Sequence, residues 1–398
     1  MKLVQAGLAR DIAISLLLVI GWQLLSAALA WADPVHWTCQ SITLAVALTP
    51  GGPDSQAVLG TYCVPATWAA GPHEADVLTP GATYNGSYWD WPTDPALYSY
   101  LDKTLRAGRA TLDYDRIGTG ASSHPLSTEI SIDTDAYVLH QIVAWLRTSR
   151  SYRRINLIGH SLGSVISIQE AGHYQDVSRV VLTGLLHEPS IGAGFATTLL
   201  SLLYPAELDP QFSDRGLDPG YLTTMPFTRA AAFYSSTADP AVIAYDEAHK
   251  DVVSATDLSS LASTWGLPPG PNMSDSITAP VLVVIGARDA IFCTAPPALD
   301  CRAPAELAKS ESPYYDSAAS LTIYSIPDTG HDIALHPSAD LSFAMINDWI
   351  SGHSTAISHQ TTLPCGPGRQ PHRRLSAATT ISPRPCSALA SHAHGNSS

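Results

Sequence analysis

The sequence predicts an α/β fold with a mostly parallel sheet, flanking helices and one inserted segment. Short apolar runs alternate with helical patterns over the first half of the 398 residues, which predicts right-handed βαβ crossovers. The alternation stops after Leu186 and resumes at Val281, so the intervening chain is expected to lie outside the sheet. A hydrophobic fraction of 45% supplies apolar residues for one sizeable core.

The individual elements follow from local patterns. An opening antiparallel hairpin is expected because two apolar stretches, Ser41–Leu48 and Ala57–Val64, flank a turn rich in Pro and Gly. Further strands are expected at Ala75–Leu78, Ala110–Asp113, Ile155–Ile158, Val180–Leu182, Val281–Ile285 and Leu321–Ile326. Helices are expected at Pro95–Ala107, Thr134–Arg147, directly after Ser161, at Ala303–Lys309 and at Ser338–Ile350.

The N-terminal segment resembles a secretory signal peptide. Lys2 and Arg10 precede the apolar run Ile12–Leu25, and Ala30-Trp31-Ala32 forms a cleavage site of the Ala-x-Ala type. The run nearly reaches the length of a membrane span, so an uncleaved anchor is the alternative. We expect cleavage after residue 32, because polar residues interrupt the run, and hence a secreted or extracytoplasmic protein.

The cysteines agree with export. Six cysteines permit 15 pairings, and a scheme of sequence-local disulfides is one hypothesis among these. It pairs Cys39 with Cys63, Cys293 with Cys301 and Cys365 with Cys386. No Cys-x-x-Cys or Cys/His cluster has the spacing of a zinc site, so neither a metal nor another cofactor is expected.

Five segments are expected along the chain. They are a signal peptide at 1–32, the first part of the core at 33–186, a cap insertion at 187–279, the second part of the core at 280–350 and a disordered tail at 351–398. The tail is rich in Ser, Thr, Pro, His and Ala without an apolar period. The net charge of −14 gives no basic surface, so nucleic acid and anionic membrane are not expected as partners.

The sharpest chemical signal is Gly159-His160-Ser161-Leu162-Gly163, between an expected strand and an expected helix. The glycines allow a sharp turn that exposes Ser161 at the strand's C-terminal end, and the helix N-terminus behind it offers free N–H groups. A serine that merely caps an ordinary turn is the alternative interpretation. The context favours Ser161 as a nucleophile.

A nucleophilic serine needs a base and an orienting carboxylate. Asp289 and His331 each follow the C-terminal end of an expected strand, in the order Ser, Asp, His. Glu188, after the strand Val180–Leu182, is the alternative acid, and His336 is the alternative base. Three other carboxylates, of Asp300, Asp328 and Asp332, are expected to be surface or loop groups.

A loop that could bind an oxyanion is expected at Thr79–Tyr84. Gly81 permits close backbone approach, and the N–H groups of Ala82 and Leu162 would form a two-donor hole.

Together the loop at 79–84, the turn at 115–122, the serine turn at 159–163 and the paired Asp289 and His331 resemble the α/β-hydrolase superfamily over roughly residues 35–350. This resemblance implies a mostly parallel, eight-stranded sheet with flanking helices and an inserted cap. Residues 81–90 also resemble a group of secreted bacterial esterases and lipases, in which the loop begins His-Gly. Pro80 stands at the position of that histidine, which puts the rigidity of the loop in question.

The resemblance implies a serine hydrolase of the carboxylesterase type. Aromatic residues and few basic ones in the expected cap predict a small uncharged ester or lactone as substrate. A thioesterase or lactonase with the same triad is the alternative, and a catalytically inactive binding module is a second one. Epoxide hydrolase chemistry is disfavoured, because related enzymes of that kind carry Asp where Ser161 stands.

Overall fold

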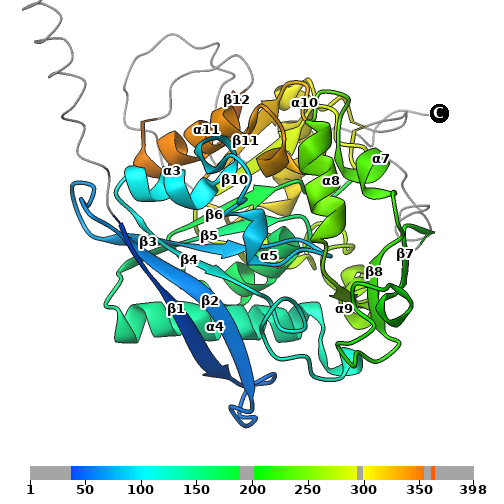
Figure 1. Ribbon diagram of the computed structural model, residues 1–398. Coiled ribbons are helices and arrows are strands. Elements are labelled where there is room, and N and C mark those ends of the chain that lie inside the picture. The colour runs from blue at the N-terminus through cyan, green and yellow to red at the C-terminus, as the bar shows by residue number, and fades with distance from the viewer. Residues whose placement is uncertain (1–36, 189–200, 294–298, 354–359, 364–398) are drawn as a thin grey trace, which may run out of the picture. The chain divides into compact units, whose positions relative to one another are not determined.

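A nine-stranded sheet is the centre of the protein in the computed structural model, which describes residues 37–188, 201–293, 299–353 and 360–363 (Figure 1). The strands are β1 (Trp37–Val46), β2 (Gln56–Pro65), β3 (Glu74–Thr79), β4 (Ala110–Tyr114), β5 (Arg154–His160), β6 (Arg179–Thr183), β10 (Val281–Gly286), β11 (Leu321–Ile326) and β12 (Gln360–Leu363). Their order is β1-β2-β4-β3-β5-β6-β10-β11-β12.

The middle of the sheet is parallel. From β4 through β3, β5, β6 and β10 to β11 each neighbouring pair is parallel, whereas β2 pairs with β4 and β12 with β11 in antiparallel fashion. Every residue of β10 and β11 is buried, as expected of strands that are covered on both faces. The mostly parallel α/β-hydrolase sheet expected from the sequence is therefore confirmed.

The helices cover both faces of the sheet. They are α2 (Pro95–Tyr98), α3 (Tyr100–Arg106), α4 (Ile132–Ser149), α5 (Leu162–Tyr174), α10 (Pro304–Glu311) and α11 (Ala339–Ser351). Helices α3 and α11 pack against each other on one face, and α4 packs against α5 on the other (Figure 1). Because parallel strands end at one edge of the sheet, the loops after β3, β5, β10 and β11 meet there.

Two elements differ from the sequence-based expectation. The helix expected at Pro95–Ala107 is divided at Ser99, whose backbone is extended and whose hydroxyl accepts a hydrogen bond from the Asp102 N–H. The tail expected to be disordered contributes Gln360–Leu363 as a ninth strand, β12. A four-residue edge strand needs only main-chain partners, so no apolar period announces it.

The chain between β6 and β10 forms a second, three-stranded sheet of β7 (Leu203–Pro205), β8 (Tyr221–Thr224) and β9 (Val253–Ser254). Among its described residues, the α-helices are α7 (Arg229–Phe233), α8 (Pro240–Ala248) and α9 (Ala255–Ser260). Its strands do not pair with the large sheet. Its limits as a cap, at 187 and 279, stay a prediction.

Two of the three expected disulfides are present. Cys39 on β1 is bonded to Cys63 on β2, and Cys293 is bonded to Cys301. The third pair, Cys365 and Cys386, and the expected signal peptide lie outside the described residues. Within the described ranges, no helix has both the length and the apolar character needed to cross a membrane.

Candidate active site

Ser161 occupies a strained turn between β5 and α5. Its backbone has φ 52° and ψ −116°, a conformation that non-glycine residues rarely adopt and that often marks functional sites. The turn closes against the end of β3, since a Cβ atom on Gly163 would lie 2.2 Å from the Thr79 carbonyl oxygen. A Cβ on Gly159 would lie 2.5 Å from the Gly163 carbonyl oxygen. Only glycines fit both positions, and the serine is raised at the end of the strand.

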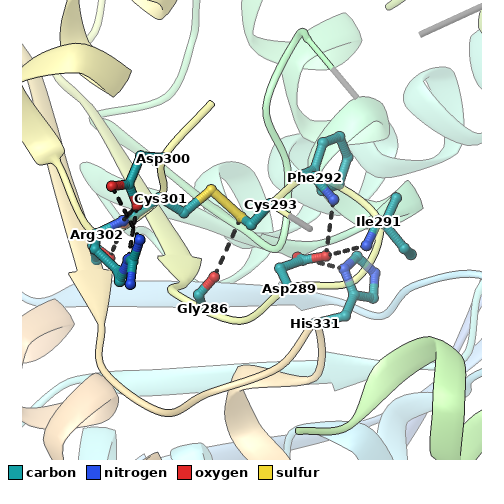
Figure 2. The surroundings of a disulfide bond; sticks show 10 residues. Gly286, Asp289, Ile291, Phe292, Cys293, Asp300, Cys301, Arg302 and His331 are labelled. Carbon is teal, nitrogen blue, oxygen red and sulfur yellow. Dashed lines mark hydrogen bonds and ion pairs between the residues drawn. A yellow bond between two sulfur atoms is a disulfide. The ribbon is translucent and has the colours of Figure 1, made fainter. Parts of the chain in front are cut away.

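Asp289 and His331 form a buried pair in the loops after β10 and β11. The Nδ1 atom of His331 lies 2.8 Å from Oδ2 of Asp289, as Figure 2 shows. Oδ1 of Asp289 accepts hydrogen bonds from the N–H groups of Ile291 (2.8 Å) and Phe292 (3.2 Å). Burial opposes the charged imidazolium, but the Asp289 carboxylate outweighs it and raises the pKa of His331. The carboxylate is held so that it can orient the ring and stabilise its protonated form.

Ser161 and His331 open onto one pocket. It has a volume of about 430 Å³, including space open to solvent. Its lining is Ala82, Thr83, Tyr84, His160, Ser161, Leu202, Leu203, Thr224, Phe233, Ile291 and His331. The structure thus brings residues from the loops after β3, β5, β10 and β11 and from the segment between β6 and β10 to one place.

The loop after β3 lies directly against the serine turn. A Cβ atom on Gly81 would come within 3.2 Å of the Ser161 Cβ, so this glycine allows the close approach that the sequence predicts. Ala82 lines the pocket, and Leu162 is the first residue of α5, whose N–H has no partner within its own helix. Pro80 lies beside Gly163: a Cβ atom on Gly163 would lie 2.7 Å from the carbonyl oxygen of Pro80. The loop is therefore close-packed despite the proline.

Arg116 supports this loop, a role that was not predicted from the sequence. The side chain is buried, and its Nη2 donates to the Gly81 carbonyl oxygen at 3.2 Å. Its Nη1 lies 2.8 Å from Asp135 and 3.6 Å from Asp257, which compensate the buried charge. The only signal in the sequence was the position of Arg116 in the turn after the fourth strand.

The two rival residues have other partners. Glu188 is exposed, and burial together with the nearby charge of Glu188 raises the pKa of the Tyr314 hydroxyl. His336 is buried, and its Nε2 accepts hydrogen bonds from the N–H groups of Ser235 and Gly330, both at 3.0 Å. It thereby joins the His331 loop to the segment between β6 and β10.

Asp332 lies in a loop, as expected, but it is fully buried rather than at the surface. Its Oδ1 lies 3.1 Å from Nε2 of His160, and its Oδ2 accepts a hydrogen bond of 2.5 Å from the Tyr84 hydroxyl. Burial raises the pKa of Asp332 and lowers that of His160, so both shifts favour the uncharged forms. Asp300 and Asp328 are exposed, as expected.

A buried ion pair continues this network into the segment between β6 and β10. The Tyr84 hydroxyl lies 3.0 Å from Asp246, whose carboxylate pairs with Arg229 through two contacts of 2.7 and 2.8 Å. Arg229 also donates to the Thr83 hydroxyl at 2.9 Å and stacks over the Tyr84 ring at 4.3 Å. The loop after β3, the His331 loop and helices α7 and α8 are thus held in one polar network. Nothing in the local sequence pattern indicates it.

The sheet order, the strained serine turn and the Asp–His pair define the class of α/β hydrolases. Residues 77–342, about two thirds of the chain, match the alpha/beta hydrolase family, and the protein belongs to this family. No curated protein sequence shows significant similarity to the chain.

Solved structures with low sequence identity share the fold. The structure of DcsB in complex with its substrate analogue is 18% identical, with a TM-score of 0.52, and the match covers 80% of this chain and 100% of that one. A candidate aryl esterase from Burkholderia cenocepacia is 16% identical, with a TM-score of 0.51 and coverage of 79% and 99%. A candidate lipase from Acinetobacter baumannii is 14% identical, with a TM-score of 0.50 and coverage of 81% and 98%.

Proposed function

We propose that the protein is a secreted serine hydrolase that cleaves carboxylic esters through an acyl-enzyme on Ser161. One observation carries the proposal: the buried Asp289–His331 pair and Ser161, on a strained turn, open onto the same pocket. A base and a nucleophile in one pocket, with the base oriented by a buried carboxylate, supply what acyl transfer needs.

The reaction would proceed in two halves. His331 takes the proton of the Ser161 hydroxyl as its oxygen attacks the ester carbonyl, and the N–H groups of Ala82 and Leu162 stabilise the oxyanion. The C–O bond then breaks, and the alcohol leaves with the proton from His331. Water, deprotonated by His331, attacks the acyl-enzyme; the bond between the acyl group and Ser161 then breaks, the acid leaves, and His331 returns the proton to the Ser161 oxygen. Asp289 stabilises the imidazolium in both halves.

The lining of the pocket supports an uncharged substrate. Four of its residues offer large apolar side chains: Leu202, Leu203, Phe233 and Ile291. The three basic residues that the sequence places in the expected cap are compensated, since Arg215 pairs with Asp251, Arg229 with Asp246 and Lys250 with Asp209. An anionic substrate would find no unpaired cation among these three. The candidate esterase and lipase among the structural neighbours point to the same chemistry.

Export rests on the expected signal peptide and on the two disulfides, because disulfides persist in oxidising compartments. Intact mass spectrometry of protein from the culture medium tests this. A chain that begins at Asp33 supports it, and a retained segment 1–32 would favour a membrane anchor.

The function is tested by labelling with a fluorophosphonate, followed by peptide mapping and assays with neutral and charged esters, thioesters and lactones. We expect a single adduct on Ser161 and faster turnover of neutral esters. Ser161→Ala should lose roughly 10⁴-fold or more in kcat, whereas Ser213→Ala, at an exposed serine, should keep full activity. Folded protein without an adduct on Ser161 would contradict the mechanism and favour the binding-module interpretation. A preference for thioesters or lactones would favour the alternative substrate class.

A further inference from the structure

Three titratable side chains meet between α4 and α5, outside the proposed active site. His140 lies on α4, Glu170 on α5, and Asp176 two residues after the end of α5. Nδ1 of His140 lies 3.6 Å from Oε1 of Glu170 and 3.3 Å from Oδ2 of Asp176. The ligand-type atoms of all three residues lie within 4.8 Å of one another.

Glu170 is the unusual member of this cluster. Its side chain is fully buried, and among the described residues neither of its carboxylate oxygens has a hydrogen-bond partner. The Nδ1 atom of His140 also has none there, so the contacts within the cluster have the distances of ion pairs without the geometry of hydrogen bonds. The His140 ring at 3.6 Å compensates the buried Glu170 carboxylate incompletely, which is costly, and a cation bound between the three side chains would offset this cost.

The separations of the atoms suit such a cation. A tetrahedral Zn²⁺ with bonds of about 2.0–2.1 Å places its ligand atoms about 3.3 Å apart. The two measured distances, 3.3 and 3.6 Å, are close to this value. One imidazole nitrogen and two carboxylate oxygens are ligands that zinc accepts, with a fourth position left for water.

The surroundings hold the ligands and leave a route to solvent. The Tyr174 ring stacks on His140 at 3.7 Å and 11°, which fixes the imidazole plane. Arg147 donates to the backbone carbonyl of Asp176, which leaves the carboxylate available. The side chains of His140 and Asp176 are 27% and 25% exposed, so an ion can enter from solvent.

We propose that His140, Glu170 and Asp176 bind a divalent cation of the Zn²⁺ type that clamps the end of α5 to α4. Glu170 lies nine residues after Ser161, about 14 Å along the helix. The ion is therefore a structural one, which stabilises the helix behind the serine turn and takes no part in the reaction.

Isothermal titration of the full chain with ZnCl₂, after treatment with EDTA, tests the site. We expect one tight Zn²⁺ per wild-type chain, with no competition from Mg²⁺, which prefers octahedral oxygen sites. His140→Ala and Glu170→Gln should weaken this binding at least about 100-fold, because loss of an outer partner of a ligand already costs about 10–100-fold. Zn²⁺ should also raise the Tm of the wild type but not that of Glu170→Gln.

His249→Ala is the matched control. His249 stacks on Tyr245 with the same 3.7 Å and 11°, and it lies outside the cluster. This variant should bind Zn²⁺ like the wild type. Histidines after residue 353 are present in every variant, so any zinc that they bind is common to all.

Three outcomes would overturn the proposal. They are no zinc uptake by the wild type, equal affinity in Glu170→Gln and wild type, and equal loss in His249→Ala. If His140→Ala does not fold, Glu170→Gln decides, since it preserves the size of the side chain. The proposal would also fail if zinc changed the Tm of neither protein and Glu170→Gln had a higher Tm than the wild type. Protons alone would then satisfy the cluster.

Discussion

Replacement of Asp289 by Asn tests how the candidate site supports a charged imidazole. The carboxylate lies 2.8 Å from Nδ1 of His331. At an effective dielectric constant of about 20, a unit charge at that distance stabilises the imidazolium by about 6 kcal/mol. A loss of this stabilisation in the transition state corresponds to about 10⁴-fold in rate. The amide would also face the ring with the wrong donor, so the productive tautomer would be disfavoured.

The assay is kcat/KM for a neutral chromogenic ester as a function of pH. Because Asp289 raises the pKa of His331, and the reaction needs the neutral ring, the rate of the wild type increases as pH rises through this pKa. In Asp289→Asn the acid limb of the pH profile, where the rate increases with pH, should move to lower pH, and the maximal kcat/KM should fall about 10⁴-fold. Asp328→Asn, at an exposed carboxylate in the same loop, is the control and should change neither.

Asp289 would not be the orienting acid if Asp289→Asn kept more than a tenth of the activity and the acid limb of its pH profile did not move. If Glu188→Gln then lost the activity instead, Glu188 would be the orienting acid.

Three further variants, and Gly270→Ala as a control for one of them, test the supporting structure. Tyr84→Phe removes the hydroxyl between two buried carboxylates and should cost about 1–3 kcal/mol in urea unfolding; an unchanged midpoint would contradict the network. Replacement of both Cys293 and Cys301 by Ser opens a bridge with a sequence separation of 8 and should cost about 2.5 kcal/mol in urea unfolding without reductant; a variant as stable as the wild type would contradict this. Gly163→Ala should cost about 3 kcal/mol or more by thermal unfolding. In contrast, Gly270→Ala, where no heavy atom lies within 4 Å but φ is +92°, should cost about 1 kcal/mol, and similar losses would argue against close packing at the serine turn.

The local sequence was sufficient to predict most strands of the large sheet and the turn that carries Ser161. Apolar runs of strand length identify β10 and β11, and the glycines around Ser161 identify the turn before α5, because these signals depend on neighbours within a few residues. Asp289 and His331 could be selected for the same reason, since each follows a strand directly. Their catalytic roles stay predictions, although the structure brings them to 2.8 Å.

The packing of distant elements determines which polar groups are buried and which partner residues they contact. Asp332 follows His331 in the chain and has the sequence context of a loop, yet it contacts His160 and Tyr84, which lie 172 and 248 residues away. Likewise, no ligand spacing announces the cluster of His140, Glu170 and Asp176, which exists because α4 packs on α5. A hydrophobic period records which face of an element is buried, but the identity of a polar partner across the core depends on how distant elements pack. This is why the sequence determined the sheet and the serine turn, while the packing of the elements determined the polar network around them.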